Sequence, residues 1–272
     1  MAIADDFDGF LIDLDGVVWI GREPIPGSAE ALAALLAAGK ELVFVTNNPA
    51  RPPQRYAERL QGMGVEVGAE RIVTSGMVTA RLAGAAAAGG SAFVIGEDAL
   101  KQMVVAAGAT VLDAEAGAAA DVVVVSGHRG FDYAELLAAK RALDGGAALF
   151  ATSHDPTLPM PDGEWPGTGS ILAAVETASG RRAEIGGKPE HHLFEMAIDV
   201  IRGSKGTDDV QKEPQIGRLA MVGDRISSDI DGGRAAGLAT VLVLSGTSSR
   251  AEAEAADPAP DHVLQNLAGL LR

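Results

Sequence analysis

The sequence predicts an α/β protein in which a parallel-sheet core is interrupted by an inserted second α/β unit. Along the 272 residues, short apolar runs that end in turn residues alternate with Ala- and Leu-rich stretches of helical length. This is the order of parallel strands and crossover helices. At 83–90 the composition changes to almost pure Ala and Gly, which we interpret as the seam of the insert. A plain helix that ends in glycine is the alternative for that stretch.

The composition excludes several classes of protein. Hydrophobic residues make up 47% of the chain, enough for sizeable cores, and the absence of cysteine excludes disulfides and thiolate metal sites. A net charge of −15 argues against a nucleic-acid partner, since phosphate backbones are bound mainly by clustered Lys and Arg. With no leader pattern and no run long enough to cross a bilayer, we expect a cytoplasmic protein without a membrane partner.

The first predicted strand begins at Phe10 and leads to two aspartates, Asp13 and Asp15, followed by a glycine. Side chains two apart on a strand point to one face, so these carboxylates should lie together. Because they repel each other and the first basic residue is Arg22, they need a cation or a shared proton. Oxygen ligands favour magnesium over zinc. An Asx turn that closes the strand is the alternative.

Each further element before the seam has its own signal. Gly and Pro predict a hairpin over 17–27, and Ser28 is expected to cap a helix that Gly39 closes. The other predicted elements are a helix at 29–38, a strand at 41–45, a helix at 54–63, a strand at 71–75 and a helix from about 77. Strand, helix and strand in succession imply a parallel crossover, so the hydroxyl of Thr46 and the amides of Asn47 and Asn48 should face the same edge as the aspartates. Turn and cap chemistry is their alternative interpretation.

The insert shows its own alternation of strands and helices. We predict strands at 91–95, 121–126 and 147–151, helices near 97–107 and 132–144, and a long Pro-, Gly- and Asp-rich loop at 152–170. Loops of that length in compact domains are often functional. The residues of the insert that could face a ligand are His128, Arg129, Tyr133, His154, Asp155 and Trp165.

After the insert, two glycines lead to Lys188 and to a proline suited to the first turn of a helix. The predicted elements that follow are a helix at 190–202, a polar surface loop at 203–217, a strand at 219–222 and a strand at 240–244, with 251–272 mostly helical. The strand at 219–222 ends at Asp224, and the next helix carries Asp229 beneath that loop.

These polar residues share one place in the predicted fold. In an open parallel sheet the ligand crevice lies outside the carboxyl ends of the strands. We therefore expect convergence of Asp13, Asp15, Thr46, Asn47, Lys188 and Asp224 at one edge. Such a set of carboxylates, hydroxyl and amide donors and a lysine suits phosphoryl transfer. It does not suit hydride transfer, since no G-x-G-x-x-G follows the first strand, and there is no Walker lysine motif for holding nucleotide phosphates.

Four short motifs resemble, in order, those of the haloacid dehalogenase-like superfamily. They are Asp13-Leu14-Asp15-Gly16-Val17, Val45-Thr46-Asn47-Asn48, Gly187-Lys188-Pro189, and Gly223-Asp224-Arg225 with Asp229. The insert resembles the large α/β cap of the class IIA branch, which contains para-nitrophenylphosphatase, NagD-like and glycerol-phosphate phosphatases. The resemblance implies a Rossmann-like catalytic core at 1–82 and 183–272, with a cap at 83–182 that determines substrate specificity.

The resemblance also implies roles for the two motif aspartates. Asp13 would be the nucleophile that forms an aspartyl-phosphate, and Asp15 would protonate the leaving alcohol and then activate water. Asp13, the backbone carbonyl of Asp15 and Asp224 would hold one Mg²⁺.

The same resemblance assigns the phosphate site. Thr46, the backbone N–H of Asn47 and Lys188 would bind the phosphoryl oxygens, and Lys188 would also neutralise the nucleophile. Asp229 would orient Lys188 or a metal-bound water.

The implied activity is a Mg²⁺-dependent phosphomonoester hydrolase acting on a small phosphorylated metabolite. Glycerol phosphate is preferred, and phosphoglycolate, pyridoxal phosphate, sugar phosphates and nucleoside monophosphates stay open. Departures from the branch, such as Pro49-Ala50 after the second motif, leave the substrate undecided, and we expect Arg129, His154 and Asp155 to contact the leaving group. The alternatives are a phosphotransferase or mutase using the same intermediate and a non-catalytic phospho-ligand-binding protein. A homodimer through the cap is also left open.

Overall fold

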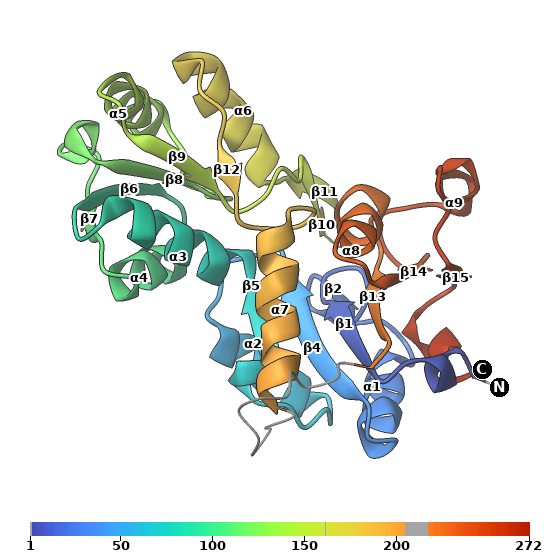
Figure 1. Cartoon of the computed structure of the whole chain (residues 1–272). Helices are drawn as coiled ribbons and strands as arrows, with labels where there is room; N and C mark the ends of the chain where they lie inside the picture. Colours follow the sequence, from blue (N-terminus) through green and yellow to red (C-terminus); the bar gives the residue numbers. More distant parts are fainter. Residues whose placement is uncertain (1, 161, 205–216) are drawn as a thin grey trace.

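The computed structural model describes residues 2–160, 162–204 and 217–272. It contains two parallel sheets, each covered by helices, and the two chain ends lie beside each other, where the N–H of Ile3 donates to the carbonyl of Arg272 (Figure 1). Most of the predicted surface loop at 203–217 falls outside the described residues. Within the described part of the chain, no helix has both the length and the apolar character needed to cross a membrane.

The core sheet has six parallel strands in the order β15-β14-β13-β1-β4-β5. Their bounds are β1 Gly9–Asp13, β4 Glu41–Thr46, β5 Ile72–Thr74, β13 Leu219–Gly223, β14 Ala239–Val243 and β15 His262–Leu264. The parallel pairing predicted for the first two strands is confirmed, because β1 lies between β4 and β13. Their carboxyl ends therefore meet at one edge, where the first motif follows β1.

The apolar run of β1 is explained by burial on both faces of the sheet. Phe10 and Ile12 pack with helices α1 and α2, and Leu11 packs on the opposite face with helix α7. The bounds of these helices are α1 Ser28–Ala37, α2 Pro53–Gly62 and α7 His191–Ser204. Since side chains alternate along a strand, Asp13 shares the face of Leu11 and points towards the side of α7.

The second sheet has five parallel strands in the order β12-β9-β8-β6-β7. Their bounds are β6 Ser91–Ile95, β7 Thr110–Leu112, β8 Val122–Val125, β9 Ala148–Ala151 and β12 Glu184–Ile185. Helices α3 and α4 cover one face, and α5 and α6 cover the other. The bounds of these helices are α3 Ser75–Ala87, α4 Asp98–Ala106, α5 Tyr133–Asp144 and α6 Thr168–Ser179. The chain enters this unit through α3 and returns through β12 into α7 (Figure 1).

The remaining elements are short. The two antiparallel ribbons are β2 Trp19–Ile20 with β3 Glu23–Pro24, which is the predicted hairpin, and β10 Thr157–Met160 with β11 Gly163–Pro166. The others are α8 Asp231–Ala235, α9 Arg250–Ala255, a π-helical turn at Ile226–Ile230, and 3-10 turns at Ile3–Asp6, Ala69–Arg71, Gly117–Ala119 and Leu267–Leu271.

Four local predictions are wrong. The stretch 152–170 is not one loop, since it forms the β10–β11 ribbon and begins α6. The stretch 251–272 holds the edge strand β15, which pairs with β14 and contributes the sixth strand. The Ser28 hydroxyl donates to the carbonyls of Val18 and Ile25 and does not cap α1, which begins after a left-handed Gly27. Pro189 lies before the first turn of α7 and not within it.

Residues 83–87 complete helix α3, so the plain-helix interpretation of the Ala-rich stretch is the correct one for its first part.

Candidate active site

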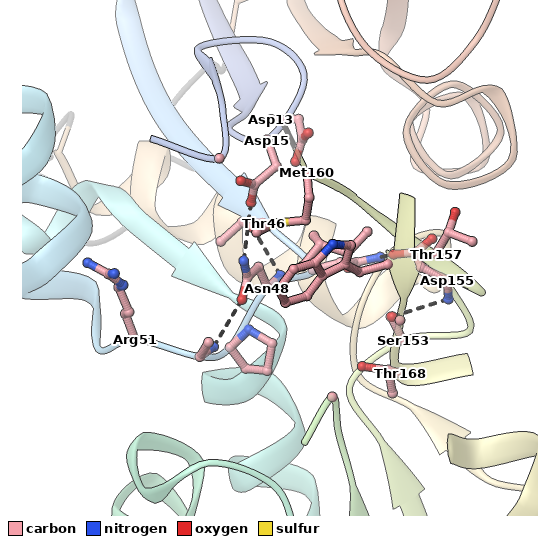
Figure 2. A pocket seen from close by; sticks show the side chains of 18 of the residues that line it. Asp13, Asp15, Thr46, Asn48, Arg51, Ser153, Asp155, Thr157, Met160 and Thr168 are labelled. Atoms are coloured by element: carbon pink, nitrogen blue, oxygen red, sulfur yellow. Dashed lines mark hydrogen bonds between the residues drawn. The ribbon is translucent and has the colours of Figure 1, made fainter. Parts of the chain in front are cut away.

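A cavity of about 1370 Å³ opens between the carboxyl edge of the core sheet and the inserted unit. Figure 2 shows Asp13, Asp15 and Thr46 on one side of it and Ser153, Asp155 and Thr168 on the other. All seven core residues singled out from the sequence line it, namely Asp13, Asp15, Thr46, Asn47, Lys188, Asp224 and Asp229. The structure thus brings the dispersed motifs together.

A buried lysine joins two of the acids. Lys188 is 2% exposed, and its Nζ donates to Oδ1 of Asp13 at 2.5 Å and to Oδ1 of Asp229 at 2.6 Å. Burial by itself lowers the pKa of Lys188, but the two carboxylates outweigh burial and raise it above its ordinary value, so the ammonium stays charged. Asp229 accepts the N–H of Arg225 with its other oxygen, at 3.0 Å. Both oxygens of Asp229 are therefore engaged, and this acid positions the lysine.

Three carboxylates crowd around this one lysine. Oxygens of Asp13, Asp224 and Asp229 all lie within 4.8 Å of one another. Burial and the neighbouring acids raise the pKa of Asp13 well above its ordinary value, although Lys188 opposes this, and burial with Asp229 raises the pKa of Asp224 to about 6. The cluster carries more negative charge than Lys188 can balance, and its donors are all oxygen, so it fits a hard divalent cation such as Mg²⁺.

Gly16 makes this crowding sterically feasible. Its φ is +90°, and a Cβ at this position would lie 2.4 Å from Oδ2 of Asp224. Only glycine accommodates both the backbone conformation and the close approach of the Asp224 carboxylate. The N–H of Thr247 donates to Oδ2 of Asp224 at 2.6 Å and holds it in place.

Asp15 occupies a separate, aromatic side of the cavity. Its Oδ1 accepts from Nε1 of Trp19 at 3.1 Å, and its Oδ2 accepts from Nδ2 of Asn48 at 3.4 Å. Burial raises the pKa of Asp15, and these two hydrogen bonds partly oppose the rise. The Trp19 ring stacks on Tyr56 and lies under the guanidinium of Arg59, 3.8 Å from the ring centroid. A carboxyl group that keeps its proton more readily than usual is suited to act as a general acid.

The end of β4 presents a hydroxyl and a backbone loop. The hydroxyl oxygen of Thr46, which is buried, accepts the N–H of Asn48 at 3.0 Å, so its own proton is free to donate into the cavity. The side chain of Asn47 binds the backbone of Lys188 at both ends: its Oδ1 accepts the Lys188 N–H at 2.8 Å, and its Nδ2 donates to the Lys188 carbonyl at 3.0 Å. Asn47 therefore places the lysine.

At the cavity, Asp155 and the β10–β11 ribbon of the inserted unit contact the core. Oδ2 of Asp155 accepts from Nδ2 of Asn47 at 2.7 Å, and its Oδ1 lies 3.9 Å from Nε of Arg225. Arg225 also donates to the carbonyl of Thr157 in β10 at 3.3 Å. The insert thus contacts the core beside Lys188.

The residues expected from the insert are only partly assembled at the cavity. Arg129 lines it and lies over the Trp165 ring at 4.5 Å, and Asp155 and His128 line it too. The expectation that His154 faces the ligand is not met, because His154 is exposed and is not among the residues that line the cavity. Tyr133 is 78% exposed and also lies outside the lining. Thr152 and Ser153 are both buried, and the chain turns His154 outward after them.

Sequence reasoning missed Trp19, which donates to Asp15. It expected Asn48 at this edge without naming Asp15 as its partner, and it gave a role to the backbone N–H of Asn47 and not to the side chain, which holds Lys188. The available signals were a tryptophan within the Gly- and Pro-rich hairpin and a second asparagine in Thr46-Asn47-Asn48. Neither signal identifies its partner, because Asn47 and Lys188 are 141 positions apart in the chain.

Comparisons with known proteins agree with this geometry. A haloacid dehalogenase-like hydrolase family model matches residues 10–110, and a second, HAD-hydrolase-like model matches residues 185–270. Chronophin of Mus musculus is 37% identical over 97% of this chain and 91% of its own length. Dihydroxyacetone phosphatase of Corynebacterium glutamicum is 33% identical over 96% of this chain and 90% of its own length. A crystal structure of glycerol phosphate phosphatase from Mycobacterium tuberculosis in complex with magnesium superposes with a TM-score of 0.85 at 33% identity, covering 100% of this chain and 78% of that one.

Proposed function

The chain belongs to the haloacid dehalogenase-like hydrolases and is a phosphatase, and we propose that it hydrolyses small phosphate monoesters with Mg²⁺ through an aspartyl-phosphate on Asp13. The observation that carries this proposal is the buried cluster in which Lys188 bonds Asp13 and Asp229 while Asp224 lies within reach of both. A binding module would need neither a nucleophilic carboxylate nor a neighbouring acid held apart from it.

Mg²⁺ fits the donor set of this cluster, since every candidate ligand is a carboxylate or carbonyl oxygen. We propose that Asp13, Asp224 and the backbone carbonyl of Asp15 hold the ion. When bound, Mg²⁺ supplies positive charge that offsets the repulsion between the phosphate and the carboxylates. A solved relative, the glycerol phosphate phosphatase of Mycobacterium tuberculosis, was crystallised in complex with magnesium, which supports the choice of ion.

The chemistry follows from which carboxylate oxygens are occupied. Lys188 binds Oδ1 of Asp13, and Oδ2 of Asp13 has no hydrogen-bond partner among the described residues. In the proposed first step Oδ2 attacks phosphorus, the bond from phosphorus to the leaving oxygen breaks, and Asp15 gives that oxygen its proton. In the second step Asp15 takes a proton from water as the water oxygen attacks phosphorus, which releases phosphate and restores Asp13.

The phosphoryl oxygens need donors that are already in place. Thr46 offers a hydroxyl proton, Lys188 an ammonium, and we propose that the backbone N–H of Asn47 is the third donor. Two hydrogen bonds join the side chain of Asn47 to the backbone of Lys188, which fixes the positions of these two residues relative to each other.

We propose that the core of 1–82 and 183–272 carries the chemistry and that the cap of 83–182 selects the leaving group. Two relatives are named for phosphates of three-carbon compounds, which supports glycerol phosphate as the first substrate to test. Among the described residues, Arg22 and Arg51 line the cavity without forming an ion pair, and Arg129 lines it from the cap, so a leaving group with hydroxyl or anionic groups would find donors.

The test measures phosphate release from a panel of phosphomonoesters, with and without Mg²⁺, in the wild type and in Asp13→Asn. We expect metal-dependent release that falls by at least about 10⁴-fold in the variant, as for loss of a nucleophile. Asp199→Asn, which changes an exposed aspartate on α7, is the matched control and should keep full activity. Activity in Asp13→Asn close to that of the wild type would refute the assignment of the nucleophile.

A further inference from the structure

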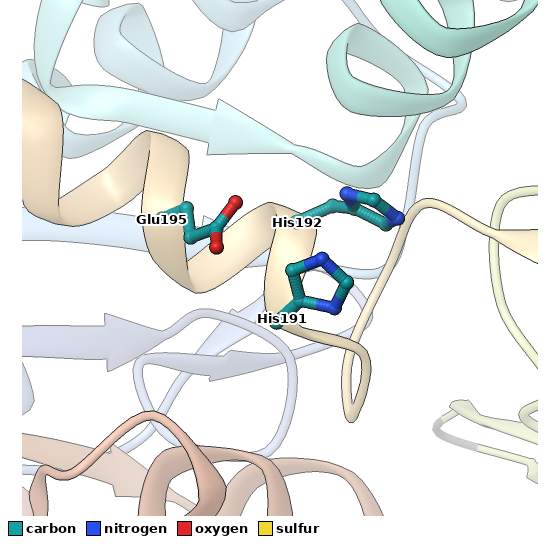
Figure 3. A group of neighbouring side chains, drawn as sticks. All are labelled: His191, His192 and Glu195. Carbon is teal, nitrogen blue, oxygen red and sulfur yellow. The ribbon is translucent and has the colours of Figure 1, made fainter.

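A second group of metal-ligating side chains lies away from the cavity, at the first turn of α7. It consists of His191, His192 and Glu195, and one ring nitrogen of each histidine and one carboxylate oxygen of Glu195 lie within 4.8 Å of one another (Figure 3). The two imidazole rings are 3.9 Å apart between centroids. His191 and Glu195 are exposed and His192 is half-buried, so an ion from solution can reach the group.

The helix itself sets this spacing. Residues three and four apart are neighbours on the surface of a helix, so Glu195 is a neighbour of both His192 and His191. The first turn of a helix repels cations only weakly, and the carboxylate of Glu195 places a negative charge beside the two rings.

The donor set differs from that of the active-site cluster. Two imidazole nitrogens and one carboxylate favour borderline first-row ions such as Zn²⁺, whereas Mg²⁺ prefers oxygen alone. The two clusters should therefore select different ions. Three protein ligands also leave at least one position for water, as in open zinc sites.

A further carboxylate supports one of the rings. Oε1 of Glu184 in β12 lies 3.3 Å from Nε2 of His192. This contact places negative charge beside the ring and involves Nε2, so Nδ1 of His192 is the nitrogen that does not contact Glu184.

The contact between Glu184 and His192 joins the two units of the fold. Glu184 belongs to the sheet of the inserted unit, and His192 belongs to the helix that packs on the core sheet. The segment between them carries Lys188. An ion held by α7 and steadied by β12 would therefore sit where the chain crosses from one unit to the other.

We propose that His191, His192 and Glu195 form a binding site for one first-row transition-metal ion of the Zn²⁺ class, at the junction of the inserted sheet and the core. The site is separate from the carboxylate cluster of Asp13, and its existence does not depend on the proposed phosphatase mechanism.

Zn²⁺ itself is the probe. The full-length chain without an affinity tag is titrated with Zn²⁺ by calorimetry in excess Mg²⁺, which competes for the carboxylate cluster. We expect one Zn²⁺ per chain and at least about 10-fold weaker binding in His191→Ala and in His192→Ala. His154→Ala, which removes an exposed histidine of the cap, is the matched control and should bind Zn²⁺ as the wild type does.

The wild type provides a second readout that needs no variant. Imidazole nitrogen resonances of His191 and His192 should shift on addition of Zn²⁺, while that of His154 should not. Absence of Zn²⁺ uptake, or uptake that both histidine variants retain, would overturn the proposal. Uptake that is lost in Asp224→Asn but kept in His191→Ala would place the ion among the active-site carboxylates and would also overturn it.

Discussion

Lys188→Met tests whether the lysine is what allows the buried carboxylates to coexist. Methionine keeps much of the length and the packing of the side chain but removes the ammonium that contacts Asp13 at 2.5 Å and Asp229 at 2.6 Å. The side chains of Asp13 and Asp229 are only 8% and 1% exposed, so water cannot replace the lost charge. Two like charges about 4 Å apart repel by about 4 kcal/mol at an effective dielectric of about 20. Loss of one partner from a buried ion pair costs about 3–5 kcal/mol.

We therefore expect Lys188→Met to lower the free energy of unfolding by about 3–5 kcal/mol in EDTA near pH 8. The loss of unfolding free energy should be smaller near pH 5 than near pH 8. The pKa of Asp13 is already raised in the folded state, and removing Lys188 raises it further. The folded variant then binds more protons than the unfolded chain, so its stability rises as the pH falls from about 8 to about 5.

The assay is urea unfolding followed by the fluorescence of the two tryptophans, in EDTA, at both pH values. Lys101→Met is the matched control, because Lys101 is 38% exposed and only 3.8 Å from Asp98, and it should cost less than about 1 kcal/mol. The double variant Lys188→Met with Asp229→Asn should recover part of the loss, since it removes one of the repelling charges. A loss in Lys188→Met no larger than in Lys101→Met, or one equal at the two pH values, would refute this reasoning.

Two further predictions concern the acid and the metal. Trp19→Phe removes the N–H that stabilises ionised Asp15, so the limb of the pH–rate profile that reports Asp15 should move to higher pH. We also expect kcat to fall roughly 10-fold. The control Trp165→Phe should leave that limb in place. An unchanged limb in Trp19→Phe would contradict the role of this hydrogen bond. Because the pKa of Asp224 is raised to about 6, the folded protein in EDTA should lose stability as the pH rises from about 4 through about 6. Mg²⁺ competes with those protons, so it should raise the melting temperature more near pH 7.5 than near pH 5, and equal shifts would contradict its binding to Asp224.

Much of the fold follows from local patterns along the chain. The strands β1, β4, β6, β8, β9, β13 and β14 were predicted within one or two residues, because each is an apolar run buried on both faces and bounded by turn residues. The edge strands β7, β12 and β15 and the β10–β11 ribbon were missed. Each of these strands is only two to four residues long, too short for a clear pattern, and they become strands through pairing with a neighbour that the local pattern does not reveal.

The candidate site, like the fold, could be predicted from the sequence only in part. The residue types at Asp13, Asp15, Thr46, Lys188 and Asp224 could be identified from the sequence, because each ends or follows an apolar strand or, for Lys188, precedes a helix at the edge where parallel strands end.

Tertiary structure alone decided which of these groups touch. It placed Trp19 against Asp15, used the side chain of Asn47 to hold Lys188, and turned His154 away from the cavity. It also set Glu184 beside His192, across the crossing between the two units. The physical reason is that residue type and strand period are local properties, whereas a hydrogen bond needs two groups within about 3 Å, and that distance is set by how distant segments pack.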